Sequence, residues 1–375
     1  MSVLAQLAAA MVAAPLFVGV PVDPVGGQLL GTVETPVVSP GGGVPALPEI
    51  EARAWLVADA ETGDVLAAYD AHVPLPPAST LKLLTALAVL PAIEPDQSYT
   101  ASEDNGRVEG SRVGIVPGQT YSLADLKYGL FLASGNDAAH GLAELVGGLP
   151  ACIELMNAEA ARLGAFDTHA ATPHGLDEPG QVSSAYDLAL FGRAVLADAD
   201  LAEVAQTRAY DFPGLDGQTF QIQNQNRLLG SYDGAIGLKT GYTTEAGHTL
   251  VAAAERDGTK LVVTILGAEG RAEPVAAALL DWGFAAAGTA EPVGVLVTPE
   301  EVAAAAAQAQ VDEAAADPPA AQPAEGEHPS AADSAGLTLG AGVRSWWPAG
   351  LAVPAMLGLL VVRQRRRRSR GRYAA

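Results

Sequence analysis

Two stretches of the chain alternate between apolar runs and short polar turns in the manner of β-hairpins. The first covers residues 54–69, where two apolar runs enclose a polar turn at 61–64, as expected for two short antiparallel strands. The second covers residues 248–267, where two apolar runs enclose Asp257 and Gly258, a pair that favours a tight turn. We therefore predict two hairpins that lie far apart in the sequence.

Between these hairpins the apolar positions recur every three or four residues, which is the spacing of one face of an α-helix. One more apolar helix follows the second hairpin. The predicted helices span about 79–93, 122–133, 137–147, 151–163, 183–197 and 272–287. Strands at both ends of a helical region predict an α+β domain over residues 50–290, in which a helical cluster packs against an antiparallel sheet.

The segments that flank this domain have other compositions. Residues 1–22 carry no charged side chain and are rich in Ala, Val and Leu, which favours the signal peptide of an exported protein, although the usual basic start is lacking. Residues 23–49 are rich in Gly and Pro and predict an extended linker. Residues 291–344 are dominated by small, polar and acidic residues and predict a disordered stalk.

The C-terminal end of the sequence has the pattern of a membrane anchor. Residues 345–362 are uncharged and include two tryptophans near their start, whereas residues 363–375 contain seven arginines. Aromatic residues at one end of an apolar segment and a basic cluster at the other are typical of a transmembrane helix with a cytoplasmic tail. The alternative is an apolar tail with a basic patch, since the segment is short and contains Pro348 and Pro354. With the anchor, the folded domain at residues 50–290 is expected outside the cell membrane.

Composition excludes several kinds of function. The net charge of −22 argues against a nucleic-acid partner, because a phosphate backbone requires a basic surface. The single cysteine, Cys152, excludes an internal disulfide and a Cys-x-x-Cys redox pair, and its apolar surroundings predict a buried residue. Only His169 and His174 lie close together among the six histidines, which leaves a zinc site without support. No metal or other cofactor is predicted.

The four lysines of the chain point to its chemistry. They are Lys82, Lys127, Lys239 and Lys260, against 17 arginines, so most cationic positions are occupied by Arg. A lysine can lose its proton when buried, whereas an arginine effectively cannot. Lys82 follows Ser79 by three residues in a predicted helix, which places the amine within reach of the hydroxyl. Taken alone, this pair also fits a helix cap beside a surface lysine.

Two further short motifs follow. Ser134-Gly135-Asn136 lies between two predicted helices, and Lys239-Thr240-Gly241 lies in a strand-like segment before the second hairpin. Alone, the first fits a helix–helix turn and the second an edge strand with a glycine bulge. Coincidence of all three motifs in one chain is improbable, so we take them together as one site.

In this order, the three motifs resemble those of the penicillin-recognising serine D,D-peptidases and serine β-lactamases. The surrounding residues are most similar to the D-alanyl-D-alanine carboxypeptidases, the low-molecular-mass penicillin-binding proteins. The resemblance covers residues 50–290 and rests on the stretches PPASTLKLLTAL, LKYGLFLASGNDAAHGLAE, MNAEAARLGAFDT, PHGLDEPGQVSSAYDLA, NQNRLL and IGLKTGYTTEAGHTLVAAAERDG.

The resemblance implies a catalytic group of three residues. Ser79 would attack the carbonyl between the two terminal D-alanines of a peptidoglycan stem peptide and release D-alanine. Lys82 would be the base that activates it, and Ser134 would relay a proton to the leaving amine. Penicillins would acylate the same serine.

The resemblance also implies a set of substrate-binding residues. Asn136 would bind the peptide group of the substrate, and Lys239 and Thr240 its terminal carboxylate. Gly241 would leave room for the substrate backbone, and the backbone N–H of Tyr242 would form an oxyanion hole with that of Ser79.

Two alternatives use the same fold. A serine β-lactamase of the common class has Asp in the middle of the second motif, where this chain has Gly135, and it uses a Glu followed four residues later by Asn. Between residues 137 and 238 there is no such Glu. A non-catalytic wall-binding or penicillin-sensing protein would not need Ser79, which is present. We also expect a departure from many carboxypeptidases, whose additional β-rich domain is not indicated by the composition of residues 291–375.

Overall fold

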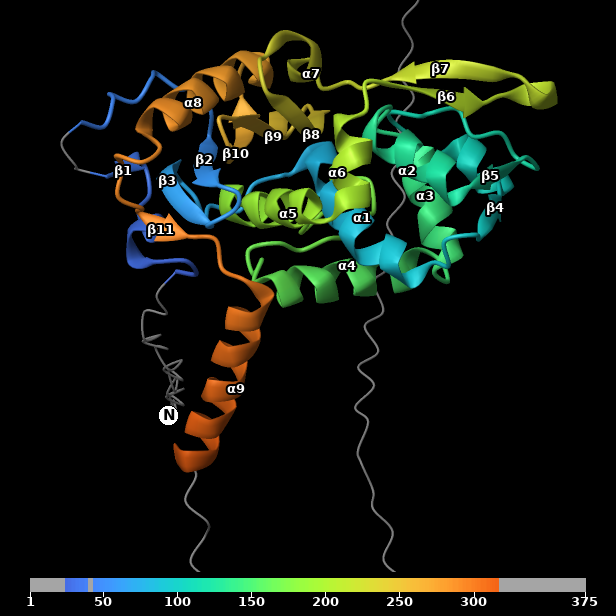
Figure 1. Ribbon diagram of the computed structural model, residues 1–375. Helices are drawn as coiled ribbons and strands as arrows, with labels where there is room; N and C mark the ends of the chain where they lie inside the picture. Colours follow the sequence, from blue (N-terminus) through green and yellow to red (C-terminus); the bar gives the residue numbers. More distant parts are fainter. Residues whose placement is uncertain (1–23, 40–42, 317–375) are drawn as a thin grey trace, which may run out of the picture. The chain divides into compact units, whose positions relative to one another are not determined.

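An antiparallel sheet joins the two predicted hairpins (Figure 1). The computed structural model describes residues 24–39 and 43–316. The sheet has seven strands in the order β1, β3, β2, β10, β9 and β8, with β11 paired to β3. Their bounds are β1 Val37–Val38, β2 Ala54–Asp59, β3 Asp64–Tyr69, β8 Ala235–Thr243, β9 Gly247–Arg256, β10 Thr259–Ala268 and β11 Gly294–Val295. The predicted α+β architecture is confirmed.

The two hairpins meet where β2 pairs with β10, with Val57 opposite Val263. The turn between β9 and β10 has Asp257 at φ 50° and Gly258 at φ 80°, as a two-residue turn with matching twist requires. Strand β8 follows β9 in the strand order and ends it, so β8 is an edge strand.

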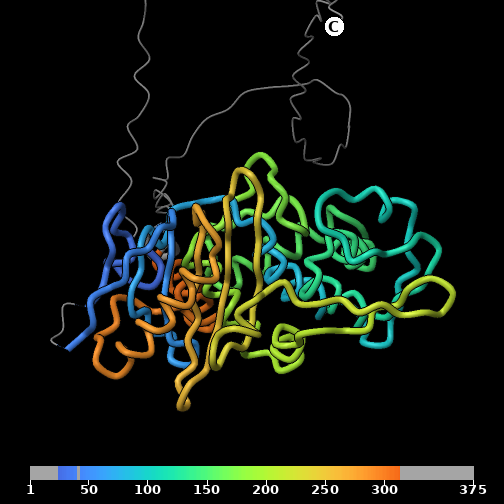
Figure 2. Tube along the Cα trace, turned by 90° about the horizontal axis from the view of Figure 1, so that it is seen from above, coloured from blue at the N-terminus to red at the C-terminus, as the bar shows by residue number. Residues whose placement is uncertain are grey.

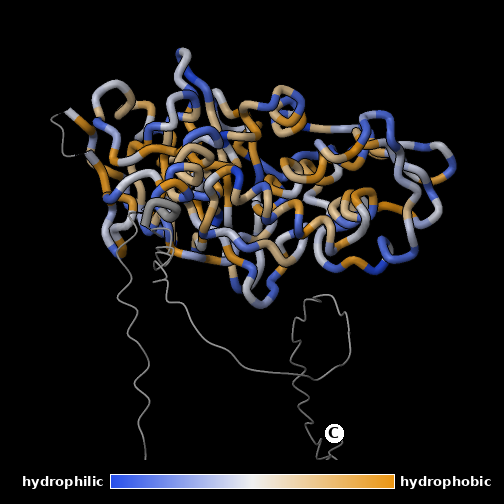
Figure 3. Tube along the Cα trace, turned by 90° about the horizontal axis from the view of Figure 1, so that it is seen from below, coloured by the Kyte–Doolittle hydropathy of each residue, from blue (hydrophilic) through white to orange (hydrophobic). Residues whose placement is uncertain are grey.

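Helices cover both faces of the sheet (Figures 1 and 2). Helix α8 (Ala272–Ala286) lies on one face and α5 (Ala185–Ala197) on the other, with α1 (Lys82–Val89) at the centre of the helical cluster. The other predicted helices are found as α2 Leu123–Phe131, α3 Asn136–Leu145 and α4 Leu149–Leu163. Hydrophobic residues are concentrated in the interior, and connecting loops are more hydrophilic (Figure 3).

A glycine on each covering helix allows close approach to the sheet. A Cβ on Gly192 of α5 would lie 2.9 Å from Val251 and 3.0 Å from Val262, and one on Gly283 of α8 would lie 2.8 Å from Leu261. Real Cβ atoms do not approach so closely, so a larger residue would push either helix away from the sheet. Cys152 is fully buried in α4 as predicted, and burial raises the pKa of its thiol to about 11.

Several short elements were not predicted. They are strands β4 Ser98–Thr100, β5 Thr120–Ser122, β6 Ala209–Pro213 and β7 Thr219–Gln223, and helices α6 Ala199–Gln206 and α7 Leu228–Ser231. The strands form two separate two-stranded sheets, β4–β5 and β6–β7. Most of their side chains are not buried, so the alternation of apolar and polar residues that marks a half-buried strand is weak.

The structure differs from the expected linker and stalk at both ends of the domain. Residues 28–31 form a 3₁₀ turn in which Leu30 is 1% exposed, and β1 follows it. Helix α9 (Pro299–Ala316) occupies the start of the expected stalk, because its alanine-rich sequence has a high helix propensity. The first turn of α9 packs against the end of α4. There is no space for a side chain at Gly164, where a Cβ would lie 2.8 Å from Val302.

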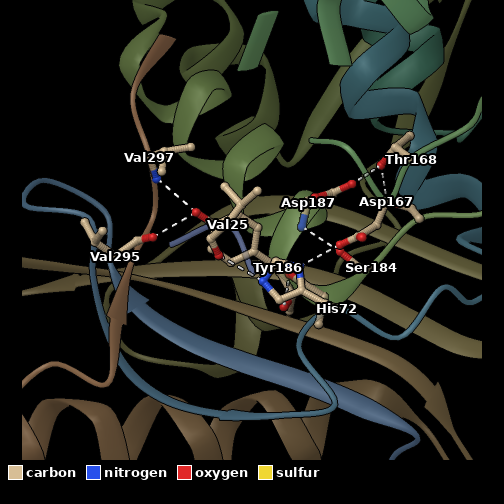
Figure 4. A network of polar contacts seen from close by, with 12 residues as sticks. Val25, His72, Asp167, Thr168, Ser184, Tyr186, Asp187, Val295 and Val297 are labelled. Carbon is tan, nitrogen blue, oxygen red and sulfur yellow. Dashed lines mark hydrogen bonds and ion pairs between the residues drawn. The ribbon is translucent and has the colours of Figure 1, made fainter. Parts of the chain in front are cut away.

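A network of polar contacts ties these two ends together (Figure 4). The Tyr186 hydroxyl donates to the carbonyl of Val295 at 2.8 Å and accepts from the N–H of Val297 at 3.1 Å. The His72 ring lies 4.6 Å from that of Tyr186 and bonds the carbonyl of Val25 at 3.0 Å. His72 therefore holds the N-terminal segment, Tyr186 holds the β11 segment, and the two rings lie against each other.

The predicted signal peptide, the predicted transmembrane segment and the basic tail lie outside the described residues. Among residues 24–39 and 43–316, no helix combines the length and the apolar character that crossing a membrane requires.

Candidate active site

Ser79 lies at the start of the central helix of the domain. A 3₁₀ turn, Ala78–Leu81, leads directly into α1. Ala78 has a φ of 49°, a strained value for a residue with a side chain. The carbonyl of Pro77 anchors the turn by accepting from the hydroxyls of Thr80 at 2.6 Å and Thr249 at 3.0 Å. The strained residue before Ser79 is thus held by helix and sheet at once, and such strain is commonly found at functional sites.

The Lys82 ammonium group contacts the Ser79 hydroxyl. Its Nζ atom lies 2.8 Å from Ser79 Oγ, 2.8 Å from Asn136 Oδ1 and 2.7 Å from the carbonyl of His174. The side chain is 1% exposed. Burial, reinforced by the positive charge of Lys239, lowers the pKa of Lys82 well below its ordinary value, and the negative charge of Asp137 opposes this only in part. A buried amine beside a hydroxyl, with a lowered pKa, can accept a proton from it.

The second motif leads into α3, whose first residue is Asn136. Ser134 has a φ of 56° and is 2% exposed. Asn136 donates from Nδ2 to the carbonyl of Glu109 at 2.7 Å, and its backbone N–H donates to the carbonyl of Ser111 at 2.7 Å. The motif is therefore attached both to Lys82 and to the loop at residues 109–111.

Asp137, which sequence analysis did not assign to the site, fixes this loop. Its carboxylate accepts from the backbone N–H groups of Val113 at 2.9 Å, Gly114 at 2.8 Å and Ile115 at 3.0 Å. A Cβ on Gly135 would lie 2.7 Å from Asp137 Oδ1, so the glycine of the motif leaves room for this carboxylate. Only its position directly after the motif in the sequence could have pointed to it.

The third motif lies on the edge strand β8. Lys239 is 1% exposed, donates to the carbonyl of Thr240 at 2.9 Å, and has its pKa lowered to about 7 by burial. A Cβ on Gly241 would lie 2.7 Å from the backbone nitrogen of Ser79 and 2.4 Å from Thr249 Oγ1. Gly241 is therefore required for the strand to approach the serine, and the alternate N–H groups of the edge strand remain free for another chain.

The three motifs meet at a cleft of about 560 Å³. The residues that line it include Ser79, Ser111, Ser134, Thr240, Gly241 and Tyr242. Three more motif residues are buried beneath the surface of the cleft, namely Lys82, Asn136 and Lys239. Lys82 contacts Ser79, and Lys239 contacts Thr240. All the residues predicted from the sequence are thus brought together, and their roles stay predictions.

The mouth of the cleft also carries charged groups that the sequence did not single out. Arg227 and Arg271 both line it. Arg271 pairs with Glu273 at 2.7 Å. Partial burial alone would raise the pKa of Glu273, but the hydrogen bond and charge of Arg271 outweigh it and lower this pKa. Two cations beside the cleft are notable in a described region with 13 basic and 38 acidic residues.

The carbonyl of His174 belongs to a second loop that sequence reasoning did not assign. Gln181 secures this loop, since its Oε1 atom accepts from the N–H of Thr172 at 2.8 Å and its Nε2 atom donates to the carbonyl of Leu176 at 2.5 Å. Burial, with the positive charge of Lys82 second, lowers the pKa of the His174 ring to about 4. The ring is therefore neutral above that pH, and its backbone, not its side chain, serves the site.

This arrangement can perform acyl transfer. The hydroxyl of Ser79 is polarised by an adjacent amine, a second hydroxyl, Ser134, shares the cleft, and a buried cation lies under the edge strand. Nucleophile, base and anion-binding group together suit attack on the carbonyl of a substrate that ends in a carboxylate.

Comparison with known proteins gives one consistent result. Residues 43–270 match the S11 peptidase family model, described as D-alanyl-D-alanine carboxypeptidase. The chain is 44% identical over 255 residues to D-alanyl-D-alanine carboxypeptidase DacB2 of Mycobacterium tuberculosis, an alignment that spans 66% of this chain and 87% of the relative. It is 39% identical over 255 residues to DacD of Salmonella typhimurium, spanning 64% of each.

Among solved structures, the fold matches a crystal structure of D-alanyl-D-alanine carboxypeptidase from Mycobacterium tuberculosis with a TM-score of 0.65 and 41% identity. That match covers 68% of this chain and 98% of the other. Residues 43–270, which match the family model, contain the three motifs and strands β2, β3, β8, β9 and β10. About a third of the DacD relative lies outside its alignment with this chain.

Proposed function

The chain belongs to the D-alanyl-D-alanine carboxypeptidase family of serine peptidases, and we propose that it removes the terminal D-alanine from peptidoglycan stem peptides. The observation that carries this proposal is the 2.8 Å contact between Ser79 Oγ and Lys82 Nζ. It places a poor nucleophile next to a buried base of lowered pKa. A serine hydroxyl needs such a base before it can attack an amide carbonyl.

The reaction proceeds in two steps. Ser79 Oγ attacks the carbonyl carbon between the two D-alanines while its proton passes to Lys82. The C–N bond then breaks, and the leaving amine receives a proton through Ser134, so that D-alanine departs. A water molecule next attacks the ester carbon of the acyl-enzyme and restores the Ser79 hydroxyl. Penicillins enter the first step in place of the peptide.

Substrate binding uses the edge strand. The substrate backbone lies along β8, with Gly241 allowing close approach, and its carbonyl oxygen takes up the backbone N–H groups of Ser79 and Tyr242. The terminal carboxylate binds Thr240 and the charged form of Lys239, while Asn136 bonds the peptide group. A carboxylate is the natural partner of a buried cation that has no carboxylate among its hydrogen-bond partners in the described structure.

We extend the proposal to the location of the enzyme. The apolar residues 1–22 act as an export signal, and residues 345–362 anchor the C-terminal end in the cell membrane with the arginine-rich residues 363–375 in the cytoplasm. The catalytic domain then acts on the outer side, where its substrate is. The support for this is composition alone.

The proposal is tested by following the intact mass of the full chain with excess benzylpenicillin. One equivalent should add to the wild-type chain and persist, and none should add to Ser79→Ala. Ser111→Ala is the matched control, because Ser111 also lines the cleft but has no lysine contact; it should still be acylated. Rapid return to the free mass would indicate a β-lactamase, and no adduct on folded protein would indicate a non-catalytic binder.

A further inference from the structure

The β6–β7 hairpin and the loop before β5 enclose a hollow that the proposed reaction does not use. It has a volume of about 400 Å³ and is lined by residues that include Gly114, Val116, Leu215, Asp216, Gln218 and Phe220. The side chain of Gln119 fastens the hairpin to the loop by donating to the carbonyl of Gly214 at 2.8 Å. The hollow is therefore a defined feature between two attached segments.

Its apolar surface is an aromatic ring held in a fixed position. Phe220 packs on Phe212 with ring centroids 5.6 Å apart, and Phe212 in turn stacks on Tyr121 at 5.5 Å. Both Phe212 and Tyr121 are buried, whereas Phe220 is 42% exposed and Leu215 is 60% exposed. One side of the Phe220 ring is thus supported by the domain, and the remainder is free to contact a ligand.

Polar groups surround this ring. Asp216, Gln218 and Thr219 line the same hollow, and their side chains have no hydrogen-bond or ion-pair partner among the described residues. Together they offer a carboxylate, an amide and a hydroxyl beside an aromatic face. A pyranose ring presents C–H groups on one face and hydroxyls at its edge, so it can satisfy both kinds of surface at once.

The hollow is connected to the catalytic cleft by a single loop. Ser111 lines the cleft, and Gly114 and Val116 line the hollow. Val116 follows Ser111 by five positions, so these two lining residues are at most about 18 Å apart along this loop. Asp137 fixes the intervening backbone directly after the second motif, so the distance between hollow and cleft is fixed as well.

This distance agrees with the proposed substrate. A stem peptide is attached to a glycan strand, and about four residues upstream of the cleaved bond span roughly 13 Å when extended. The two lengths are of similar size, so binding of a sugar at the base of the peptide in the hollow is compatible with D-alanines in the cleft.

We propose that the hollow formed by β6–β7 and residues 114–116 is a saccharide-binding site that holds the glycan part of the substrate, with Phe220 as its stacking platform. This inference rests on the proposed function for the identity of the sugar-bearing ligand. The bound glycan positions the stem peptide and raises kcat/KM for substrates that carry it.

The test compares a free pentapeptide ending in D-Ala-D-Ala with the same pentapeptide attached to its disaccharide. The full wild-type chain should prefer the disaccharide form by about fivefold to tenfold in kcat/KM. Phe220→Ala should abolish the preference while cleaving the free peptide normally, and Gln218→Ala should reduce it with less risk to the packing of the hairpin. The matched control is Phe166→Ala, which removes a phenylalanine that is 60% exposed outside both sites and should keep the preference.

Each other outcome has a definite meaning. A wild-type chain with equal kcat/KM for both substrates, or a Phe220→Ala variant that keeps the preference, overturns the saccharide site. A change in oligomeric state with no change in preference would mean that the hairpin contacts a second copy of the chain, which also overturns it. If the wild type cleaves neither substrate and is not acylated by penicillin, the proposed function fails instead, and titration with glycan chains lacking stem peptides still decides whether Phe220 binds sugar.

Discussion

Two clusters of buried polar groups in this domain have opposite chemistry. Around Lys82 a buried amine is surrounded by neutral acceptors, namely Ser79, Asn136 and the carbonyl of His174. Around Asp187 a buried carboxyl lies near a second carboxyl, Asp167 (Figure 4). Burial shifts both pKa values toward the neutral form, down for the amine and up for the acid.

The difference lies in what each cluster holds. The Lys82 cluster opens onto a cleft and contacts a hydroxyl that can lose its proton. In the Asp187 cluster, the carboxyl accepts from the Thr168 hydroxyl at 2.7 Å. The adjacent Tyr186 bonds the C-terminal segment of the domain, and His72 bonds the N-terminal segment. A buried titratable group can therefore take part in catalysis when it contacts a reactive hydroxyl. It stabilises the fold when its neighbours join separate segments of the chain.

The largest effect that separates the two clusters is expected from Lys82→Gln. This change removes the base but keeps a polar side chain of similar length. Acylation by penicillin should slow by about a thousandfold or more, whereas the free energy of unfolding should not fall, because an ionisable group whose burial is unfavourable has been removed. Stopped-flow acylation and urea unfolding of the same samples measure both.

Loss of stability together with rate in that variant would contradict the comparison, because Lys82 would then be structural as well. Lys127→Gln is a suitable control, since Lys127 forms an ion pair with Asp200 outside the cleft and should leave acylation unchanged.

The second effect concerns the stability of the Asp187 cluster. Burial raises the pKa of Asp187 from 3.8 to about 7, so the folded state binds a proton that the unfolded state releases. The stabilisation is complete below about pH 4 and is lost as the pH rises through about 7, by at most about 4 kcal/mol. Asp187→Asn should remove this dependence without slowing penicillin acylation.

Thermal unfolding of wild type and Asp187→Asn between pH 4 and pH 8 measures the difference in their stability. Other groups titrate alike in both proteins, so their contributions cancel in this difference. Parallel curves for wild type and variant would show that Asp187 does not titrate differently on folding. A slower acylation rate in the folded variant would mean that this cluster also serves the catalytic cleft.

The same contrast explains how much the sequence could predict. The hairpins, the central helices and the three motifs follow from local patterns, namely periodicity, turn residues and fixed spacing. Asp137, Gln181 and the carbonyl of His174 complete the site through contacts between distant segments, and nothing local marks a backbone carbonyl as an acceptor for Lys82. The polar network around Tyr186 was missed for the same reason, and with it the folded parts of the expected linker and stalk.

The smallest expected effect is a shift in the pH profile through Lys239. Burial lowers its pKa to about 7, so its positive charge is lost as the pH rises through that value. Because kcat/KM reports the free enzyme, its value for a peptide with a free terminal carboxylate should fall above about pH 7. Lys239→Arg keeps a charge at all these pH values, and the decline should move upward by more than about one pH unit. A substrate whose terminal carboxylate is esterified provides the control, since it has no charge for Lys239 to recognise and should show no such decline in either protein. A decline that remains in Lys239→Arg would assign it to another titrating group, and the loss of charge on Lys239 would then not be its cause.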